Sequence, residues 1–92
     1  MTIKAIKEKY KDFHKKTGDD KTMFSVIHAV SGEKYVVIGT DCKGYGKTVY
    51  QVVRVSDGRE MLGKDRCRPC DNFYEDSNDV ACEMMWDAGT DY

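Results

Sequence analysis

Apolar residues near the start of the chain recur every three or four positions, a spacing that places them on one face of an α-helix. The residues of this stripe are Ile3, Ile6, Tyr10 and Phe13. We expect a helix over residues 2–16, with Thr2 as its N-cap and Gly18 just beyond its C-terminal end. Most other positions of the segment are lysines, which predicts a helix that is apolar on one face and cationic elsewhere.

The pattern then changes to alternating or continuous apolar residues rich in valine, isoleucine and tyrosine, which is typical of β-strands. The predicted strands are residues 22–30, 34–40 and 47–55. The pair Asp57-Gly58 favours a tight turn after the third strand. We expect a short strand over residues 59–62 and a further one near Arg66 to complete the sheet.

The last part of the chain predicts a short helix over residues 79–88, ended by Gly89. The element order predicts one α+β domain, residues 1–92, with an N-terminal amphipathic helix, an antiparallel meander of four to five strands and a short C-terminal helix. We expect the helices to cover one side of the sheet. An SH3-like barrel is the alternative architecture. The predicted strand residues of the core are Tyr35, Val37, Val49 and Val53.

Charge divides the chain into two parts. All fifteen Lys and Arg residues precede position 71, against nine acidic residues, which gives this part a net charge near +6. The remaining segment, residues 71–92, has seven acidic residues and no basic one. The net charge of −1 therefore conceals a basic part and an acidic part, and such a chain suits binding to a target with complementary charges.

Four cysteines raise the question of metal binding. Cys67 and Cys70 have the spacing of a zinc knuckle, but a structural zinc site needs four ligands, and Cys42 and Cys82 stand alone. A thioredoxin-type redox pair opens a helix early in a βαβ fold, and only twenty-two residues follow Cys70. We expect reduced thiols and no cofactor, and keep a zinc-stabilised adaptor as one alternative.

No combination of residues predicts catalysis. The sequence from Gly44 to Thr48 resembles the end of a phosphate-binding loop, but it lacks the first glycine and leads into a strand instead of a helix. His14, expected on the surface of the first helix, and His28, expected at the edge of the core, have no nucleophile or carboxylate at a suitable spacing. We therefore expect a binding protein and no enzyme.

Two surfaces are candidates for binding a partner. Lys4, Lys7, Lys11 and Lys15 follow one predicted helical ridge, where they could contact successive phosphates, and the loop before the third strand adds positive charge and one aromatic side chain. The residues of that loop are Lys43, Tyr45 and Lys47. The acidic segment supplies charge and aromatic anchors for a basic groove. Its candidates are Tyr74, Asp76, Asp79, Glu83 and Trp86.

In small size, absence of a catalytic motif, compact α+β layout and divided charge, the chain resembles the small phage-encoded anti-CRISPR inhibitors, particularly those of the type I-F surveillance complex. The resemblance implies stoichiometric binding to a ribonucleoprotein in the host cytoplasm, possible contact with its guide RNA, and a block of target DNA binding. Because the chain has no run of eighteen apolar residues and no signal-like apolar stretch in residues 1–10, we expect a cytoplasmic protein with no membrane partner and no small-molecule substrate. A small nucleic-acid-binding domain that uses the lysine-rich helix is the other alternative.

Overall fold

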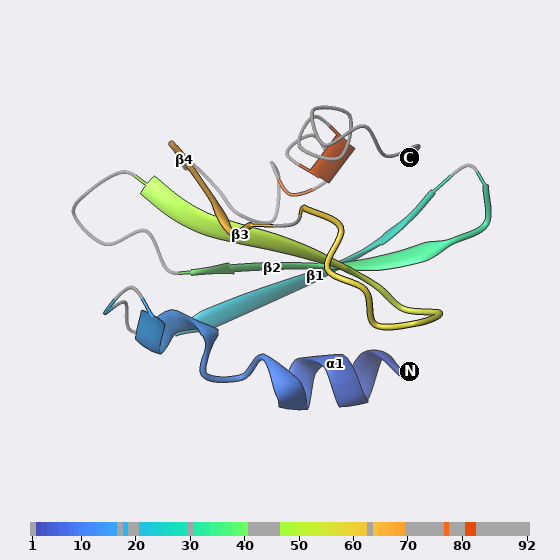
Figure 1. Cartoon of the computed structure of the whole chain (residues 1–92), viewed down its shortest axis with the longest axis horizontal. Coiled ribbons are helices and arrows are strands. Elements are labelled where there is room, and N and C mark those ends of the chain that lie inside the picture. Colours follow the sequence, from blue (N-terminus) through green and yellow to red (C-terminus); the bar gives the residue numbers. More distant parts are fainter. Residues whose placement is uncertain are drawn as a thin grey trace.

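The computed structural model describes residues 2–16, 18, 21–29, 31–40, 47–62, 64–69, 77, 81 and 82, with only the backbone for residues 47 and 66–69. Within these residues, a helix and a 3₁₀ turn precede four strands (Figure 1). The elements are α1 (Ile3–Lys9), η1 (Phe13–Lys16), β1 (Thr22–His28), β2 (Lys34–Thr40), β3 (Lys47–Arg54) and β4 (Arg66–Pro69). The N-terminal helix and antiparallel sheet confirm the α+β class.

The N-terminal helix begins as predicted but is shorter. The hydroxyl of Thr2 accepts a hydrogen bond from the backbone N–H of Ala5 at 3.0 Å, which makes Thr2 the N-cap. The prediction of one helix over residues 2–16 is wrong, because α1 ends at Lys9 and η1 follows after a turn. Gly18 has the positive φ of 77° that suits a glycine beyond a helical end.

A side chain from β1 accounts for this interruption. In a continuous α-helix the N–H of His14 would donate to the carbonyl of Tyr10. Here it donates to the hydroxyl of Thr22 at 3.0 Å, and that hydroxyl donates to the carbonyl of Lys11 at 3.1 Å. Two backbone groups that a continued helix would use are thus bound to β1, and the chain forms a 3₁₀ turn there, with the N–H of Phe13 donating to the carbonyl of Tyr10 at 3.0 Å.

The described strands form an antiparallel meander in the order β1-β2-β3-β4. β2 has the predicted bounds, and β3 ends one residue earlier than predicted. β1 ends at His28 instead of residue 30. The chain turns after Ala29, whose carbonyl accepts a hydrogen bond from the N–H of Gly32, a residue with a φ of 92°. The sheet is open within the described residues, with β1 and β4 at its two edges.

The turn after β3 contains the predicted pair Asp57-Gly58 but is wider than the expected tight turn, because the N–H of Arg54 donates to the carbonyl of Arg59 at 2.9 Å and residues 55–58 form the loop. The N–H of Gly58 donates to the carbonyl of Arg54 at 2.8 Å, and the guanidinium of Arg54 forms an ion pair with Asp57. The predicted strand over residues 59–62 is wrong, since Glu60 makes only an isolated bridge to Val53. The N–H of Met61 still donates to the carbonyl of Val52 at 2.7 Å. Pairing stops there because the N–H of Val52, which would donate back to Met61 in a continued ladder, donates to the side-chain oxygen of Gln51 at 3.0 Å, and this oxygen also accepts from the N–H of Leu62 at 3.2 Å.

The sheet carries an apolar cluster on each face. On the first, here called the helix face, α1 and η1 cover β2 and β3, and the buried residues are Ile6, Tyr10, Phe13, Val36, Ile38 and Val53. The opposite face, here called the far face, has a second cluster, whose buried residues are Met23, Ile27, Ala29, Tyr35, Val37, Tyr50, Val52, Met61, Leu62 and Ala81. Figure 1 shows α1 and η1 on one side of the sheet and residues 81–82 on the other.

These clusters correct two expectations. The sheet is covered on both sides, because residues 61–62 and 81 pack on the face that α1 leaves open. Tyr35 and Val37 are buried as predicted but belong to the far face, and Val49 is only half-buried. The C-terminal helix predicted over residues 79–88 falls largely outside the described residues, although Ala81 and Cys82 have helical backbone.

Candidate functional site

The clearest concentration of charge in the described residues lies on α1 and η1. Residues 2–16 contain six lysines and only two acidic residues, Glu8 and Asp12, and all eight are exposed. We call the exposed lysines of this segment the lysine surface. Its members are Lys4, Lys7, Lys9, Lys11, Lys15 and Lys16. The buried side chains of Ile6, Tyr10 and Phe13 hold this segment on the sheet, so the lysines project from an anchored support.

The predicted ridge of Lys4, Lys7, Lys11 and Lys15 does not form. Lys4 and Lys7 lie on α1, whereas Lys11 lies in the turn after it and Lys15 in η1, so the four do not share one helical face. Lys11 and Lys15 also form ion pairs, Lys11 with Glu8 at 3.0 Å and Lys15 with Asp12 at 3.5 Å. The hydrogen bond from Lys11 to Glu8 raises the pKa of Lys11.

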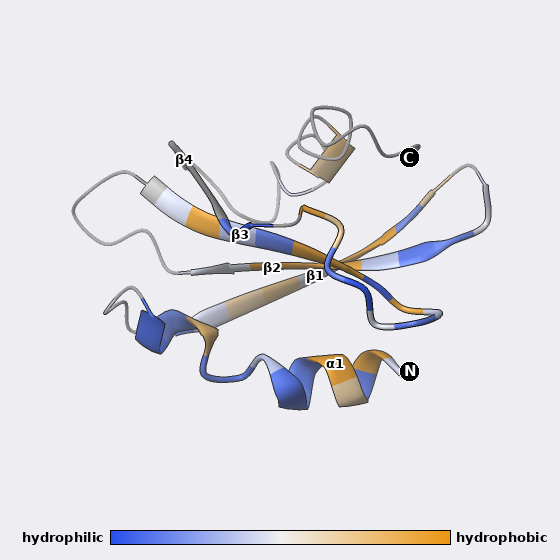
Figure 2. Cartoon of the chain, viewed as in Figure 1, coloured by the Kyte–Doolittle hydropathy of each residue, from blue (hydrophilic) through white to orange (hydrophobic). Residues whose placement is uncertain are grey.

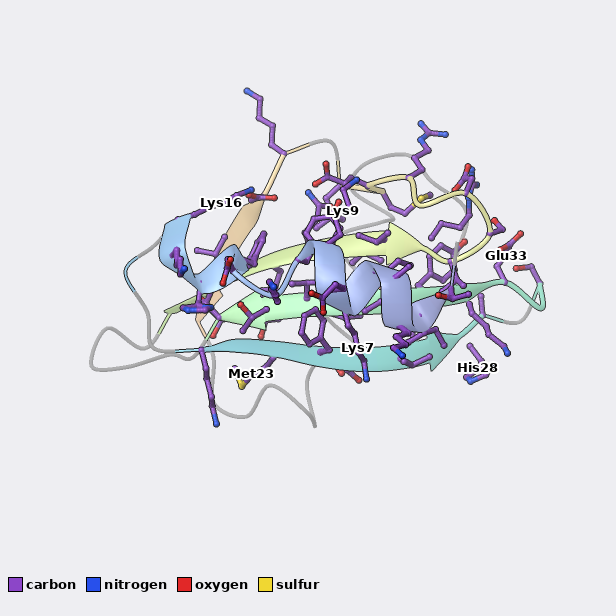
Figure 3. All side chains as sticks on the ribbon, turned by 90° about the horizontal axis from the view of Figure 1, so that it is seen from below. Lys7, Lys9, Lys16, Met23, His28 and Glu33 are labelled. Atoms are coloured by element: carbon purple, nitrogen blue, oxygen red, sulfur yellow. The ribbon has the colours of Figure 1, made fainter. Side chains whose placement is uncertain are left out.

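The three lysines of α1 differ from Lys11 and Lys15 in their ion pairs. In the described part of the chain, no ion pair involves Lys4, Lys7 or Lys9. Figure 3 shows Lys7 directed toward the β1 side of the helix and Lys9 toward the opposite side. The helix therefore presents positive charge on both flanks of its buried stripe, and this charge is available to a partner.

Lys9 and Lys16 lie over the two aromatic rings that anchor the segment. The ammonium of Lys9 is 5.5 Å from the ring centre of Tyr10, and that of Lys16 is 5.1 Å from the ring centre of Phe13. Lys16 also forms an ion pair with Asp65 at 3.4 Å. The sequence prediction did not include these two lysines. Their proximity in sequence to Tyr10 and Phe13 was the signal that could have found them.

The two histidines lie in places other than those predicted. His14 is half-buried, with its Nδ1 atom 2.8 Å from the hydroxyl of Thr22, and is therefore part of the contact between η1 and β1. His28 is exposed at the end of β1 because its side chain lies beyond the residues covered by α1. Burial raises the pKa of the Tyr10 hydroxyl, with smaller contributions from Glu60 and Asp65.

The remaining predicted site residues belong to the loop before β3 and to the acidic segment, residues 71–92. They lie outside the described residues, except that the backbone of Lys47 begins β3 and pairs with Pro69. Those outside are Lys43, Tyr45, Tyr74, Asp76, Asp79, Glu83 and Trp86.

The four cysteines of the zinc alternative are described only in part. Cys42 and Cys70 lie outside the described residues, and Cys67 is described only by its backbone in β4, whereas Cys82 is a half-buried thiol. No group of three potential metal ligands occurs among the residues described.

Comparisons of the chain with known protein families, with curated proteins and with solved structures found no match. In the part of the chain that the structure describes, no helix combines the length and the apolar character that crossing a membrane requires. The features of the chain that point to a function are the lysine surface and the division of charge between residues 1–70 and 71–92.

Proposed function

We propose that the protein is a non-enzymatic inhibitor that binds a host ribonucleoprotein, such as a CRISPR surveillance complex, and blocks its binding of target DNA. The observation that supports this proposal is the group of three lysines on α1 without acidic partners in the described residues, Lys4, Lys7 and Lys9. The seven residues of α1 span about 10 Å, and Lys4 and Lys7, three positions apart on it, can reach neighbouring phosphates of one nucleic-acid strand, while Lys9 extends the positive charge to the other flank of the helix.

The charge of the whole chain favours a mixed target over free nucleic acid. A net charge of −1 and an acidic segment over residues 71–92 weaken long-range attraction to a bare phosphate backbone. A ribonucleoprotein offers guide-RNA phosphates to the lysine surface and a basic DNA-binding groove to the acidic segment. This combination also agrees with the resemblance to anti-CRISPR proteins.

The acidic segment has its own place in this proposal. A helix over residues 79–88 would bring Asp79 and Glu83 together on one face, since residues four apart are neighbours on a helix. Trp86 and Tyr74 would supply the aromatic anchors that give lasting affinity, while the charges accelerate association.

The proposal is tested by binding to a purified, guide-loaded type I-F surveillance complex. We expect Lys4→Glu, Lys7→Glu and Lys9→Glu together to weaken binding at least about tenfold, because charge contacts with phosphate are lost and repulsion replaces them. The matched control changes Lys21, Lys34 and Lys64 to glutamate, the same charge difference on exposed residues outside α1. A gel-shift assay with target DNA measures whether the complex is blocked.

Two outcomes would overturn this proposal. Wild-type protein that neither binds the complex nor prevents its DNA binding would exclude the inhibitor function. Equal losses in the two triple variants would show that overall charge, and not the lysine surface, controls binding.

The nucleic-acid-binding alternative is favoured by the same three lysines and predicts a different result. The isolated protein would then bind free RNA or DNA, with affinity that falls steeply with salt, and the change of Lys4, Lys7 and Lys9 would reduce the salt slope by about 3.

A further inference from the structure

The two edges of the sheet are protected to different degrees. β4, at one edge, has four residues, and its sequence includes Arg66, Arg68 and Pro69. Charged residues, proline and short length are the features by which edge strands avoid pairing with other chains. β1, at the other edge, has seven residues, with no Lys, Arg, Asp, Glu or Pro among them. Figure 3 shows β1 as the outermost strand on its side of the sheet.

The pairing of β1 with β2 determines which backbone groups the free edge presents. The N–H of Ala29 donates to the carbonyl of Glu33 at 2.9 Å, so these two residues form a hydrogen-bonded pair. Hydrogen-bonded pairs alternate with non-hydrogen-bonded pairs in an antiparallel ladder. Met23, Ser25 and Ile27 therefore bond to β2, while the N–H and C=O groups of the even-numbered residues of β1 point outward.

Two side chains at this edge are incompletely covered. Phe24 and Val26 lie on the helix face, at the margin of its cluster, and both are only half-buried. Between them Ser25 points to the far face, where its hydroxyl accepts a hydrogen bond from the hydroxyl of Ser77 at 3.0 Å. Among the described residues, the edge thus combines backbone groups that pair with no other strand and apolar side chains that a further strand would cover.

We propose that the β1 strands of two copies of this chain pair antiparallel about a two-fold axis and join their sheets into one. Overlap of all seven residues places Ser25 on the axis and sets Phe24 opposite Val26 of the partner subunit. This register also satisfies the ladder, because the outward-facing even residues then form the hydrogen-bonded pairs. Pairs of an aromatic with a β-branched side chain are favourable across strands.

The sequence of β1 fits a second copy of the same strand. The full overlap sets no like charge against another, because β1 has no acidic or basic residue other than the terminal His28, which faces Thr22. The net charge of −1 adds little repulsion between copies. Seven residues per subunit are fewer than the 20–30 of a standard interface, so we expect a reversible dimer whose population depends on concentration.

The first experiment is cross-linking through Ser25→Cys. On the axis, this pair is non-hydrogen-bonded, and its Cα atoms would lie about 4.5 Å apart, within the range of a disulfide. We expect mild oxidation to yield a covalent dimer in which mass spectrometry identifies a disulfide between the two introduced thiols. The control is Ser31→Cys, an exposed serine of the β1–β2 turn, which should give no comparable link. Equal cross-linking of both variants would overturn the proposed register.

The second experiment is sedimentation equilibrium of the wild type and of Val26→Pro. Proline at this position removes an outward N–H and no bond to β2, so the fold should persist while dimerisation weakens at least about tenfold. Circular dichroism and thermal unfolding verify that the variant is folded. Val26→Lys, which retains the N–H but adds a charge at the edge, should weaken the dimer in the same way.

Either of two results would contradict the dimer. The wild type could remain monomeric at concentrations of hundreds of micromolar, or folded Val26→Pro and Val26→Lys could dimerise as strongly as the wild type. The inference is independent of the proposed function, because the variant with glutamate at positions 4, 7 and 9 should dimerise normally.

Discussion

The helix face and the far face of the sheet are covered by different kinds of segment. One continuous stretch, residues 3–16, covers the helix face, and its apolar residues recur with helical spacing. The far face is covered by short pieces distant from one another in sequence, Met61 and Leu62 from the segment after β3, and Ala81 near the C-terminus. Figure 2 shows apolar residues on both sides of the sheet.

The difference shows how each cover is held in place. The helix-face cover follows directly on the N-cap at Thr2 and is bound to the sheet by Thr22. The far-face cover depends on contacts across long sequence distances. Gln51 accepts a hydrogen bond from the N–H of Leu62 at 3.2 Å, and Ser77 donates to Ser25 at 3.0 Å. The first cover can therefore be recognised from local sequence, whereas the second requires the folded sheet.

The largest expected effect comes from removing an anchor of the helix-face cover. Phe13→Ala should lower the free energy of unfolding by about 3–5 kcal/mol, because Phe13 is buried in the helix-face cluster and its loss leaves a cavity. Urea unfolding measures this value. Lys4→Ala, on the exposed side of the same segment, should stay within about 0.5 kcal/mol of the wild type. An unchanged midpoint for Phe13→Ala would show that the segment is not packed as described.

A smaller but still large loss is expected on the far face. Leu62→Ala should reduce the free energy of unfolding by about 2–4 kcal/mol, because the leucine side chain is buried against the sheet. Chemical unfolding of this variant beside Phe13→Ala compares the two covers directly. If Leu62→Ala cost less than about 0.5 kcal/mol, the far-face cover would contribute nothing to stability and the sheet would in effect be one-sided.

The smallest effect concerns the turn that leads into the far-face cover. The guanidinium of Arg54 and the backbone N–H of Arg59 donate to Asp57 and hold its pKa well below the ordinary range. A carboxyl whose pKa is lower in the folded state stabilises the fold above about pH 4, and this contribution is lost as pH falls toward the folded pKa. Asp57→Asn should therefore lower Tm slightly at pH 7, and the difference from wild type should narrow between about pH 4 and pH 2.

A second variant identifies the source of this pH dependence. Arg54→Gln removes the other partner of the same ion pair. The difference in Tm between the wild type and Arg54→Gln should therefore also narrow between about pH 4 and pH 2. A gap between wild type and Asp57→Asn that stays constant down to pH 2 would show that the pair does not respond to acid as the lowered pKa requires.

The sequence by itself determined the elements whose signals are local. The stripe of Ile3, Ile6, Tyr10 and Phe13 predicted the helical segment, β-branched residues predicted β2 with its bounds, and Asp57-Gly58 predicted the turn after β3. These signals depend on the spacing of neighbouring residues and on backbone preferences, which act before any tertiary contact forms.

The candidate site was predictable only in part. The concentration of lysines on residues 2–16 was evident in the sequence, but their arrangement was not. The ridge through Lys11 and Lys15 failed because Thr22, six residues beyond η1, takes the hydrogen bonds that would have continued the helix. The roles of Lys9 and Lys16 likewise depend on where the rings of Tyr10 and Phe13 are held.

Only the tertiary structure decided which residues of each strand lie on the helix face and which lie on the far face. Tyr35 and Val36 are both buried apolar residues in one strand, and the sequence does not say which of them meets the helix. That assignment follows from the register of β2 with its neighbours and from the segments that return to cover each side. The alternation of side chains along a strand divides its residues between two faces of the sheet. It does not show which face the helix covers, because that depends on contacts between residues distant in sequence.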